Sequence, residues 1–321
     1  MLQRLAAFFR HPAGSLLAVA VGLGAVAFLV YKSGPRDVWS AVTRAPSLFA
    51  IVFLLEIAQA AIESWAVIAL YGPDRAKIPL REAVRSSMFS YSLIGVLPFG
   101  RAAGEAARAA MLSRYTGFPA AGAAAARMQA ISLIGNAFIS IPCAIGTWFL
   151  TGPSWLFLGI VGHFFLTGLL GLGVILAGRH SRVGDRLKKY FRSAEQWGSA
   201  LDGELKSFDR LWGPTLWICL SRIVRLFQRA ALLAAVGCSF GALVSLGSES
   251  INLVAGAVGD IIPMRLGVNE AIYAIGAKSM SMSMSDAVAM ALLNHVAQLL
   301  CVGLGFLSPL LGAPAQAEQR A

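Results

Sequence analysis

The sequence is poor in charge: 13% of its 321 residues are Asp, Glu, Lys or Arg, whereas 57% are hydrophobic. Its mean hydropathy of +0.69 is well above what the core of a soluble domain of this length requires. The composition therefore excludes a soluble globular protein and indicates an integral membrane protein.

Cysteine and catalytic motifs are also scarce. The four cysteines lie in apolar runs without paired spacing, at Cys143, Cys219, Cys238 and Cys301. This pattern argues against a disulfide framework and a zinc site, so we expect neither a metal nor a cofactor. The absence of a Walker A motif excludes an ATP-driven pump within this chain, and no H-E-x-x-H motif is present either. We expect no enzymatic activity.

Positive charge is in excess, with 27 Lys and Arg against 16 Asp and Glu, but it does not gather on a soluble face. Nucleic acid is therefore not an expected partner. The densest charge lies in residues 179–212, which predict a cytoplasmic basic loop or surface helix beside anionic lipid headgroups. With Arg4 and Arg10 before the first apolar run, the positive-inside rule places both chain ends in the cytoplasm of a multi-pass inner-membrane protein.

Apolar runs long enough to cross a hydrocarbon core of about 30 Å recur along the chain. They occupy residues 14–31, 47–71, 121–150, 154–178, 213–238 and 286–311. The first run is too long for the apolar part of a signal peptide, so we expect it to be retained. The fold class predicted is an all-α polytopic membrane protein, a single domain over 1–321 with about six transmembrane helices.

Two further apolar segments, residues 83–113 and 248–278, are broken midway by proline and glycine next to charge, at LPFGRAAGE and GDIIPMRLGVNE. Non-helical backbone is tolerated at membrane depth only where protein or a wet cavity surrounds it. We therefore predict that each segment is a re-entrant broken-helix hairpin. The Lys and Arg distribution predicts that they enter from opposite faces of the membrane.

A spacing of 165 residues relates three anchors in two parts of the chain. The pairs are Gly72 with Gly237, Pro98 with Pro263, and Glu105 with Glu270. The shared order of span, broken hairpin and span indicates two repeats, residues 47–150 and 213–311. The crossings between them predict that the repeats are inverted, the arrangement from which secondary transporters build a site near the membrane midplane.

Charged stripes mark two of the predicted spans. Glu56, Gln59 and Glu63 share one helical face, and Arg222, Arg225 and Arg229 repeat the same i, i+3, i+7 spacing. A charge at the centre of a membrane helix costs about 2.5 to 3.5 kcal/mol, so these side chains must face protein or water. Two readings stay open: the stripes are structural ion pairs, or part of the basic stripe lines a cavity for an anionic headgroup.

The hairpin breaks combine chain-breaking residues with charge. Pro98, Gly100 and Gly104 interrupt the first, and Pro263 and Gly267 the second. Each outgoing half-helix offers free N–H groups to an anion. Arg101 and Arg265 would add forked donors suited to phosphate or carboxylate.

Glu105 and Glu270 lie in the first turns of these outgoing half-helices. For each, capping of the helix start and a gating or proton-carrying role stay open. His163 and His295 lie in separate apolar spans, where we expect interior hydrogen bonding in preference to metal binding.

The sequence LPFGRAAGEAARAAMLSR, residues 97–114, is similar to the pattern Pro, Gly-rich turn, Gly-Glu, Ala-Arg, Leu-x-Arg of the membrane region of lysylphosphatidylglycerol synthases. IPMRLGVNEAIYAIG, residues 262–276, resembles the second signature of that family. The matching positions are Pro98, Gly104, Glu105, Arg108 and Arg114, followed by Pro263, Gly267 and Glu270. Phe99, Arg101, Met264, Arg265 and Asn269 depart from the pattern and leave the substrate open.

The resemblance implies a lipid flippase-like module without the aminoacyl-transferase domain, so we expect no lysyl transfer. The expected function is movement of an anionic or zwitterionic phospholipid headgroup through a polar cavity between the hairpins. The expected headgroup contacts are Arg101, Glu105, Arg108, Arg225, Arg229, Arg265 and Glu270, with Glu56, Gln59, Glu63 and Arg222 as a polar network.

Two alternatives stay open. One is an ion-coupled transporter of a small anion, with coupling through Glu63. The other is a membrane accessory of an envelope-lipid pathway, such as that of a hopanoid or polyprenyl-phosphate sugar. The partners expected are the lipid itself, a second copy of the chain or an envelope-lipid enzyme.

Overall fold

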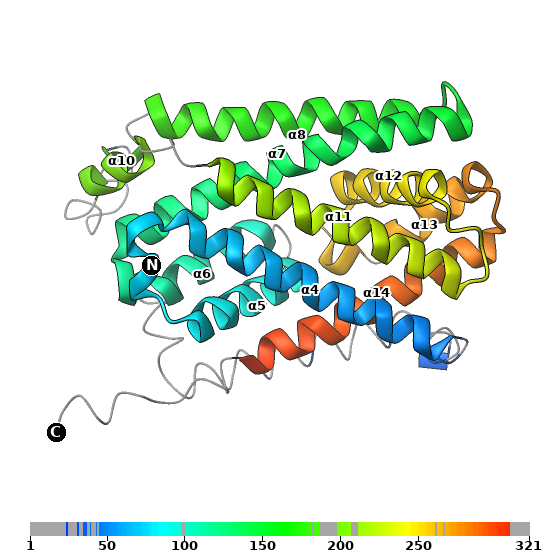
Figure 1. Cartoon of the computed structure of the whole chain (residues 1–321), viewed down its shortest axis with the longest axis horizontal. Helices are drawn as coiled ribbons and strands as arrows, with labels where there is room; N and C mark the ends of the chain where they lie inside the picture. The colour runs from blue at the N-terminus through cyan, green and yellow to red at the C-terminus, as the bar shows by residue number, and fades with distance from the viewer. Residues whose placement is uncertain are drawn as a thin grey trace.

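The computed structural model describes most of the chain as helices (Figure 1). The described residues are 45–97, 100–180, 183–185, 198–206, 211–260, 262–265 and 267–308, with the single positions 24, 31, 35, 36, 39 and 43. No strand occurs among them. The predicted all-α class is confirmed.

Five of the described helices are long and apolar enough to cross a membrane. They are α4 (Pro46–Leu70), α7 (Phe118–Thr151), α8 (Trp155–His180), α12 (Ala242–Gly259) and α14 (Met284–Leu307). Four of them coincide with the predicted spans 47–71, 121–150, 154–178 and 286–311. The predicted span 14–31 lies outside the described residues, apart from positions 24 and 31. The described part is thus a polytopic membrane fold.

The predicted span 213–238 forms α11 (Trp212–Ala235), which does not belong to those five helices. The reason is that α11 carries three arginines, Arg222, Arg225 and Arg229. Charged side chains on a membrane helix require protein partners, so a helix with this stripe is not apolar enough to cross lipid by itself. α12, in contrast, was expected as half of a hairpin and has 18 residues, about 27 Å at 1.5 Å per residue.

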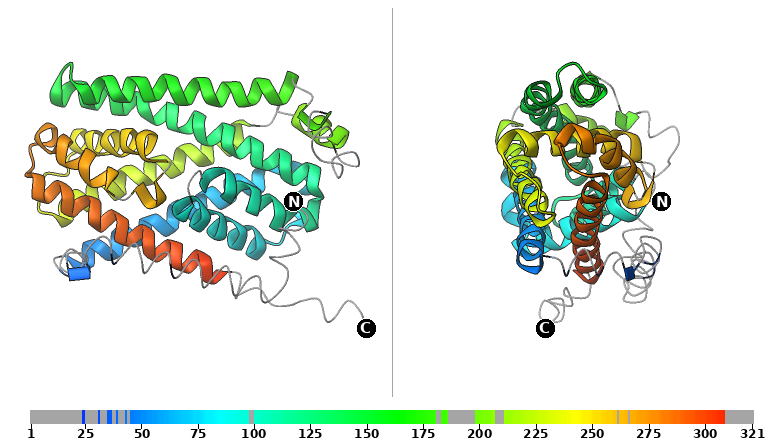
Figure 2. Two further views of the ribbon diagram at one scale, coloured as in Figure 1. Left: turned by 180° about the vertical axis from the view of Figure 1, so that it is seen from behind. Right: turned by 90° about the vertical axis from the view of Figure 1, so that its right-hand side faces the viewer.

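Both predicted breaks interrupt helices. α5 (Leu80–Val96) and α6 (Gly100–Thr116) form the first broken pair, and Pro98 between them lies outside the described residues. The second broken pair consists of α12, the 3₁₀ turn η3 (Pro263–Arg265) and α13 (Val268–Gly276). Figure 2 shows the two pairs in opposite halves of the molecule. Each pair begins and ends in its own half, with the break near the middle.

The order of elements recurs, with corresponding helix starts 166 residues apart. α4 and α7 begin at residues 46 and 118, and their counterparts α11 and α14 begin at 212 and 284. Figure 1 shows that α4 and α11 run in opposite directions, as do α7 and α14. The packing is reciprocal as well, because α5 contacts α14 while α12 contacts α7. The inverted arrangement of the two repeats stays a prediction.

Apolar packing is concentrated toward the two ends of α4, with polar residues between. Val52 belongs to a core cluster with Leu232, Ile251 and Tyr273, on the α12–α13 side. Ala66 belongs to a second cluster shared with α5, α6 and α7. Between these two residues, α4 carries Glu56, Gln59 and Glu63. The fold therefore places its polar residues in a layer at mid-length.

Close contact between α5 and α14 depends on a residue without a side chain. A Cβ atom at Gly305 would overlap Ser92 Oγ and the carbonyl oxygen of Met88, whereas a Cβ at Gly303 would meet nothing within 4 Å. We predict that Gly305→Ala lowers the unfolding free energy by about 1 to 3 kcal/mol through overpacking. Thermal unfolding in detergent checks this, with Gly303→Ala as the control on the same helix. Equal midpoints for both variants would contradict a close approach of the two helices at Gly305.

Candidate functional site

A polar cavity of about 550 Å³ lies between the two halves. α4, α7, α8, α11, α14 and both broken pairs contribute to its wall. The predicted site residues that line it are Glu56, Gln59, Glu63, Gly100, Arg101, Arg222, Arg225, Arg229 and Arg265. The acidic and basic stripes thus meet at one cavity.

The two stripes are joined by direct contacts between α4 and α11. Arg222 Nη1 lies 2.7 Å from Glu63 Oε1, and Arg222 Nε donates to Asn136 Oδ1 at 2.9 Å. One turn further along, Arg225 Nε donates to Gln59 Oε1 at 3.0 Å. The antiparallel helices therefore bring the residues together in reverse order, Glu63 with Arg222 and Gln59 with Arg225.

Glu56 is held by two residues that the sequence analysis did not select. Gln228 Nε2 donates to Glu56 Oε2 at 2.5 Å, and the hydroxyl of Tyr91 donates to Glu56 Oε1. The Gln228 amide also contacts Gln59, at 3.0 Å between its Oε1 and Gln59 Nε2. Gln228 was detectable as a polar residue within the basic stripe, and Tyr91 gave no signal distinct from other tyrosines.

Arg229 does not pair with the acidic stripe. Its Nε lies 3.0 Å from Glu249 Oε2, and both side chains are at most 2% exposed. Arg225 Nη1 approaches the other oxygen of Glu249 at 3.7 Å, so two arginines share this carboxylate. Glu249 was missed by the sequence analysis, although a carboxylate inside the apolar run ALVSLGSESINLVAGAVG was a usable signal.

The cavity retains positive charge after these pairings. Five arginines, including Arg101 and Arg265, and three carboxylates, Glu56, Glu63 and Asp260, line it, with Glu249 as a fourth carboxylate behind Arg229. Asp260 pairs with Arg265 at 2.7 Å. Within the described residues, the guanidinium of Arg101 has no hydrogen-bond or ion-pair partner. Arg101 and the loosely shared Arg225 are therefore the cations available to an anion.

Three predicted contact residues lie outside the cavity wall. Glu105 and Arg108 are both buried and pair with each other at 3.2 Å, and Arg108 Nη2 donates to Ser90 Oγ at 3.1 Å. Glu270 accepts the N–H of Gly267 at 2.8 Å and contacts His295 Nδ1 at 2.7 Å. In the structure, Glu105 pairs within α6 and Glu270 contacts its own helix start and α14, and neither carboxylate lines the cavity.

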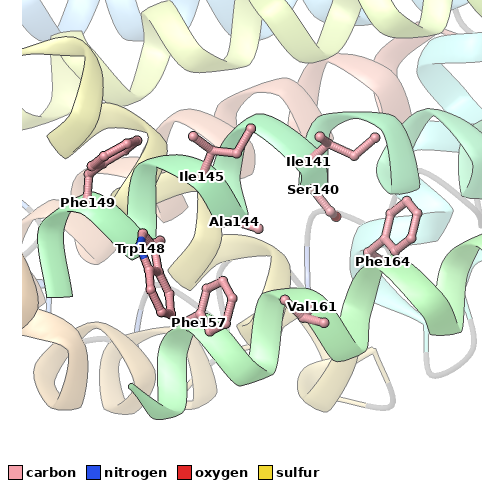
Figure 3. A pocket seen from close by; sticks show the side chains of 9 residues that line it. All are labelled: Ser140, Ile141, Ala144, Ile145, Trp148, Phe149, Phe157, Val161 and Phe164. Carbon is pink, nitrogen blue, oxygen red and sulfur yellow. The ribbon is translucent and has the colours of Figure 1, made fainter. Parts of the chain in front are cut away.

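The cavity reaches the apolar exterior beside α8. Leu166 and Leu170 line it and are 50% and 51% exposed. Next to this side, across the hydrogen bond of 2.9 Å between Ser140 Oγ and His163 Nδ1, lies an apolar groove between α7 and α8. Figure 3 shows Trp148 and Phe157 facing each other in this groove. A polar chamber thus lies next to an apolar surface groove.

Other kinds of site find no support in the described part of the chain. It contains no group of three or more His, Cys, Asp or Glu residues placed to hold a metal ion. Residues 237–241, GCSFG, have the spacing of a G-x-S-x-G nucleophile elbow, but that motif requires a strand before it. Here the segment connects α11 to α12, and Ser239 is exposed.

Comparison with known protein families gives a match over most of the chain. The family described as the lysylphosphatidylglycerol synthase TM region matches residues 15–305. No curated protein and no solved structure matches the chain.

The buried pair of Arg229 and Glu249 yields a prediction for stability. Arg229→Met leaves a buried carboxylate without its closest partner, so we expect the unfolding free energy to fall by about 3 to 5 kcal/mol. Adding Glu249→Gln removes the stranded charge and should restore more than half of the loss. Denaturant unfolding in detergent micelles measures both. A double variant as unstable as Arg229→Met alone would show that the loss is one of packing.

Proposed function

The chain belongs to the family of the lysylphosphatidylglycerol synthase TM region, and on this premise we propose that it moves a phospholipid headgroup across the membrane through the central cavity. The observation that carries the proposal is the pairing pattern in the cavity. Most of its charges are neutralised by one another, whereas Arg101 is unpartnered among the described residues and Arg225 is only loosely paired. A lipid phosphate would supply the missing anion.

The chemistry of the two cations fits a phosphate group. A guanidinium presents a planar fork of N–H donors that can bind two phosphate oxygens at once, and such charge-assisted hydrogen bonds are stronger than neutral ones. Arg101 approaches from the first broken pair and Arg225 from α11. The volume of about 550 Å³ lies in the range of ligand pockets, so a headgroup can enter it while its acyl chains stay outside.

The path of the acyl chains follows from the exposed leucines. Leu166 and Leu170 border the cavity and also belong to the outer surface of α8. A lipid whose headgroup lies in the cavity would leave its acyl chains against this surface and the adjacent groove of Figure 3. Such an arrangement avoids drawing the acyl chains through a polar layer.

We further propose that the halves α4–α7 and α11–α14 are inverted repeats whose broken pairs re-enter the membrane from opposite sides. Their reciprocal packing, α5 on α14 and α12 on α7, supports this. Alternating access in such folds comes from movement of one repeat against the other around a central site. The cavity lies where the two halves meet.

An accessory function without transport is the second candidate. The observation that favours it is the extent of internal pairing, since Glu63, Glu249 and Asp260 each contact an arginine. If all charges in the cavity have only structural roles, the polar layer fixes the positions of the helices and no lipid is transported. The unpartnered Arg101 is the feature that this second reading leaves unexplained.

Translocation in proteoliposomes distinguishes the two candidates. We expect the wild type to move headgroup-labelled phospholipids between leaflets, scored by an impermeant quencher. Replacing both cations, in Arg101→Gln/Arg225→Gln, should slow translocation about tenfold or more because two charge-assisted hydrogen bonds to phosphate are lost. Arg75→Gln, an exposed control in η1 (Gly72–Lys77), should not. If the folded double variant keeps the wild-type rate, or wild type equals empty liposomes for several headgroups, the transport proposal fails.

Orientation is a separate proposal. The end of the molecule where α4 meets η1 carries Arg75, Lys77 and Lys206, whereas the end where α13 meets α14 carries Lys278 (Figure 1). The positive-inside rule then places the α4–η1 end, with the C-terminal end of α14, in the cytoplasm of the inner membrane.

Cysteine labelling of intact cells tests this orientation. In a background with the native cysteines replaced by alanine, we expect an impermeant maleimide to label Lys278→Cys directly. Lys77→Cys should react only after permeabilisation. Both native lysines are exposed, so the reagent can reach either position. The reverse pattern would invert the proposed orientation.

A further inference from the structure

His295 on α14 is surrounded by groups of the second broken pair. Its Nδ1 lies 2.7 Å from Glu270 Oε1, and its Nε2 lies 2.9 Å from the carbonyl oxygen of Met264 and 3.1 Å from Asn269 Nδ2. The side chain of His295 is 1% exposed, whereas that of Glu270 is 18% exposed. The imidazole is thus enclosed, and Glu270 is the more exposed member of the pair.

These contacts fix how many protons the pair must hold. The carbonyl of Met264 only accepts, so its contact with Nε2 requires a hydrogen on Nε2. The contact of Nδ1 with Glu270 requires a second hydrogen, on either the imidazole or the carboxyl group. A neutral imidazole beside an ionised carboxylate holds one hydrogen only. The contacts with Met264 and Glu270 are therefore both satisfied as hydrogen bonds only when the pair holds one additional proton.

Asn269 can serve the pair in either state. When Nε2 carries no hydrogen, Asn269 Nδ2 can donate to it, as the 3.1 Å contact shows. When Nε2 is protonated, rotation of the amide presents Asn269 Oδ1, which has no hydrogen-bond partner in the structure. Only the carbonyl of Met264 is left without its donor when the proton leaves.

Met264 connects this pair to the cavity. It lies in the break of the second broken pair with φ 52°, its neighbour Arg265 has φ 56°, and both line the central cavity. Its side chain also approaches the first broken pair, where its Sδ lies 2.9 Å from the position that a Cβ on Gly95 would take. A change in the hydrogen bonding of Met264 would therefore act where the two broken pairs meet.

Other charged groups near α14 have partners of their own. Glu56 of α4 is held by Gln228 and Tyr91, Arg229 of α11 by Glu249, and Arg265 of η3 by Asp260. The remaining titratable or charged groups on elements packed against α14, or on α14 itself, are Glu63 of α4, Tyr273 of α13, Cys219, Arg222 and Arg225 of α11, Lys278 of η4 (Ala277–Met280), Arg81, Glu82 and Arg85 on the first turns of α5, and Asp286 and Cys301 of α14. Glu270 is the carboxylate with a described contact to His295.

The first broken pair has a different partner for its carboxylate. Glu105 corresponds to Glu270 at the spacing of 165 residues, but it pairs with Arg108, which stays charged throughout the physiological pH range. Histidine changes its charge within that range. The first broken pair is therefore held by a permanent cation and the second by a titratable one.

We propose that the Glu270–His295 pair is a proton-binding site that fixes the break of the second broken pair to α14 when protonated and releases the Met264 carbonyl when it loses the proton. Coupling of this proton to lipid movement rests on the proposed function, whereas the site itself does not. The ligand is a single proton, exchanged through Glu270.

Selective ¹⁵N-histidine NMR of the protein in liposomes tests the site directly. The chain has four histidines, so His295→Gln assigns the signal by its loss. We expect this signal to change from imidazolium to neutral imidazole when the pair loses its additional proton, and this change to differ in Glu270→Gln because a carboxylate stabilises the imidazolium. Glu105→Gln should leave the midpoint in place, and His163 serves as the internal reference.

A signal that does not change with pH, or a change that Glu270→Gln leaves unaltered, overturns the proton site. Translocation in proteoliposomes then tests coupling: we expect its pH midpoint to follow that of His295 and to shift in Glu270→Gln, whereas Glu105→Gln lowers the rate at every pH. A translocation midpoint unrelated to His295 overturns the coupling. If His295 titrates but the wild-type protein moves no lipid, the proposed transport function is wrong and the proton site is retained.

Discussion

The contact between α4 and α11 is the constraint on which the rest of the structure depends. A helix with three arginines on one face cannot lie in a membrane unless that face is covered by groups that accept hydrogen bonds. α4 supplies them in matching antiparallel order, with Glu63 at Arg222 and Gln59 at Arg225. The third arginine turns to Glu249, and this draws α12 into the same layer. Charge pairing, and not apolar packing, thus decides which helices meet at mid-length.

The cavity follows from this arrangement. Charged side chains need surrounding groups at hydrogen-bond distance, which apolar side chains cannot provide, so the polar layer is less completely filled than the apolar clusters on either side of it. Residues flanking the breaks of both broken pairs also lie in this layer. Non-helical backbone at membrane depth requires protein or water around it, as charged side chains do. The same constraint explains why Arg101 and Arg265, both next to breaks, line one chamber.

Much of this could be predicted from the sequence, because the signals were local. The two stripes stood out since each repeats i, i+3, i+7 in an apolar run, and the breaks stood out as proline and glycine next to charge. The pairing partners could not be predicted, since they depend on how α4, α11 and α12 cross. Glu249 and Gln228 were visible as polar residues, yet no spacing indicated that one would hold Arg229 and the other Glu56. The positive φ of Met264, a residue that rarely adopts it, also had no sequence signal.

The difference between the two halves has a consequence for how such a molecule could work. Two inverted repeats with the same chemistry would open equally well to either side, and nothing in the protein would favour a direction. Here equivalent carboxylates have unlike partners, Arg108 for Glu105 and His295 for Glu270. A proton gradient can act on the second contact through the imidazole, whereas the guanidinium of the first contact keeps its charge. The direction of any movement would then be set by the side from which Glu270 takes up its proton, while the cavity itself need only recognise the headgroup.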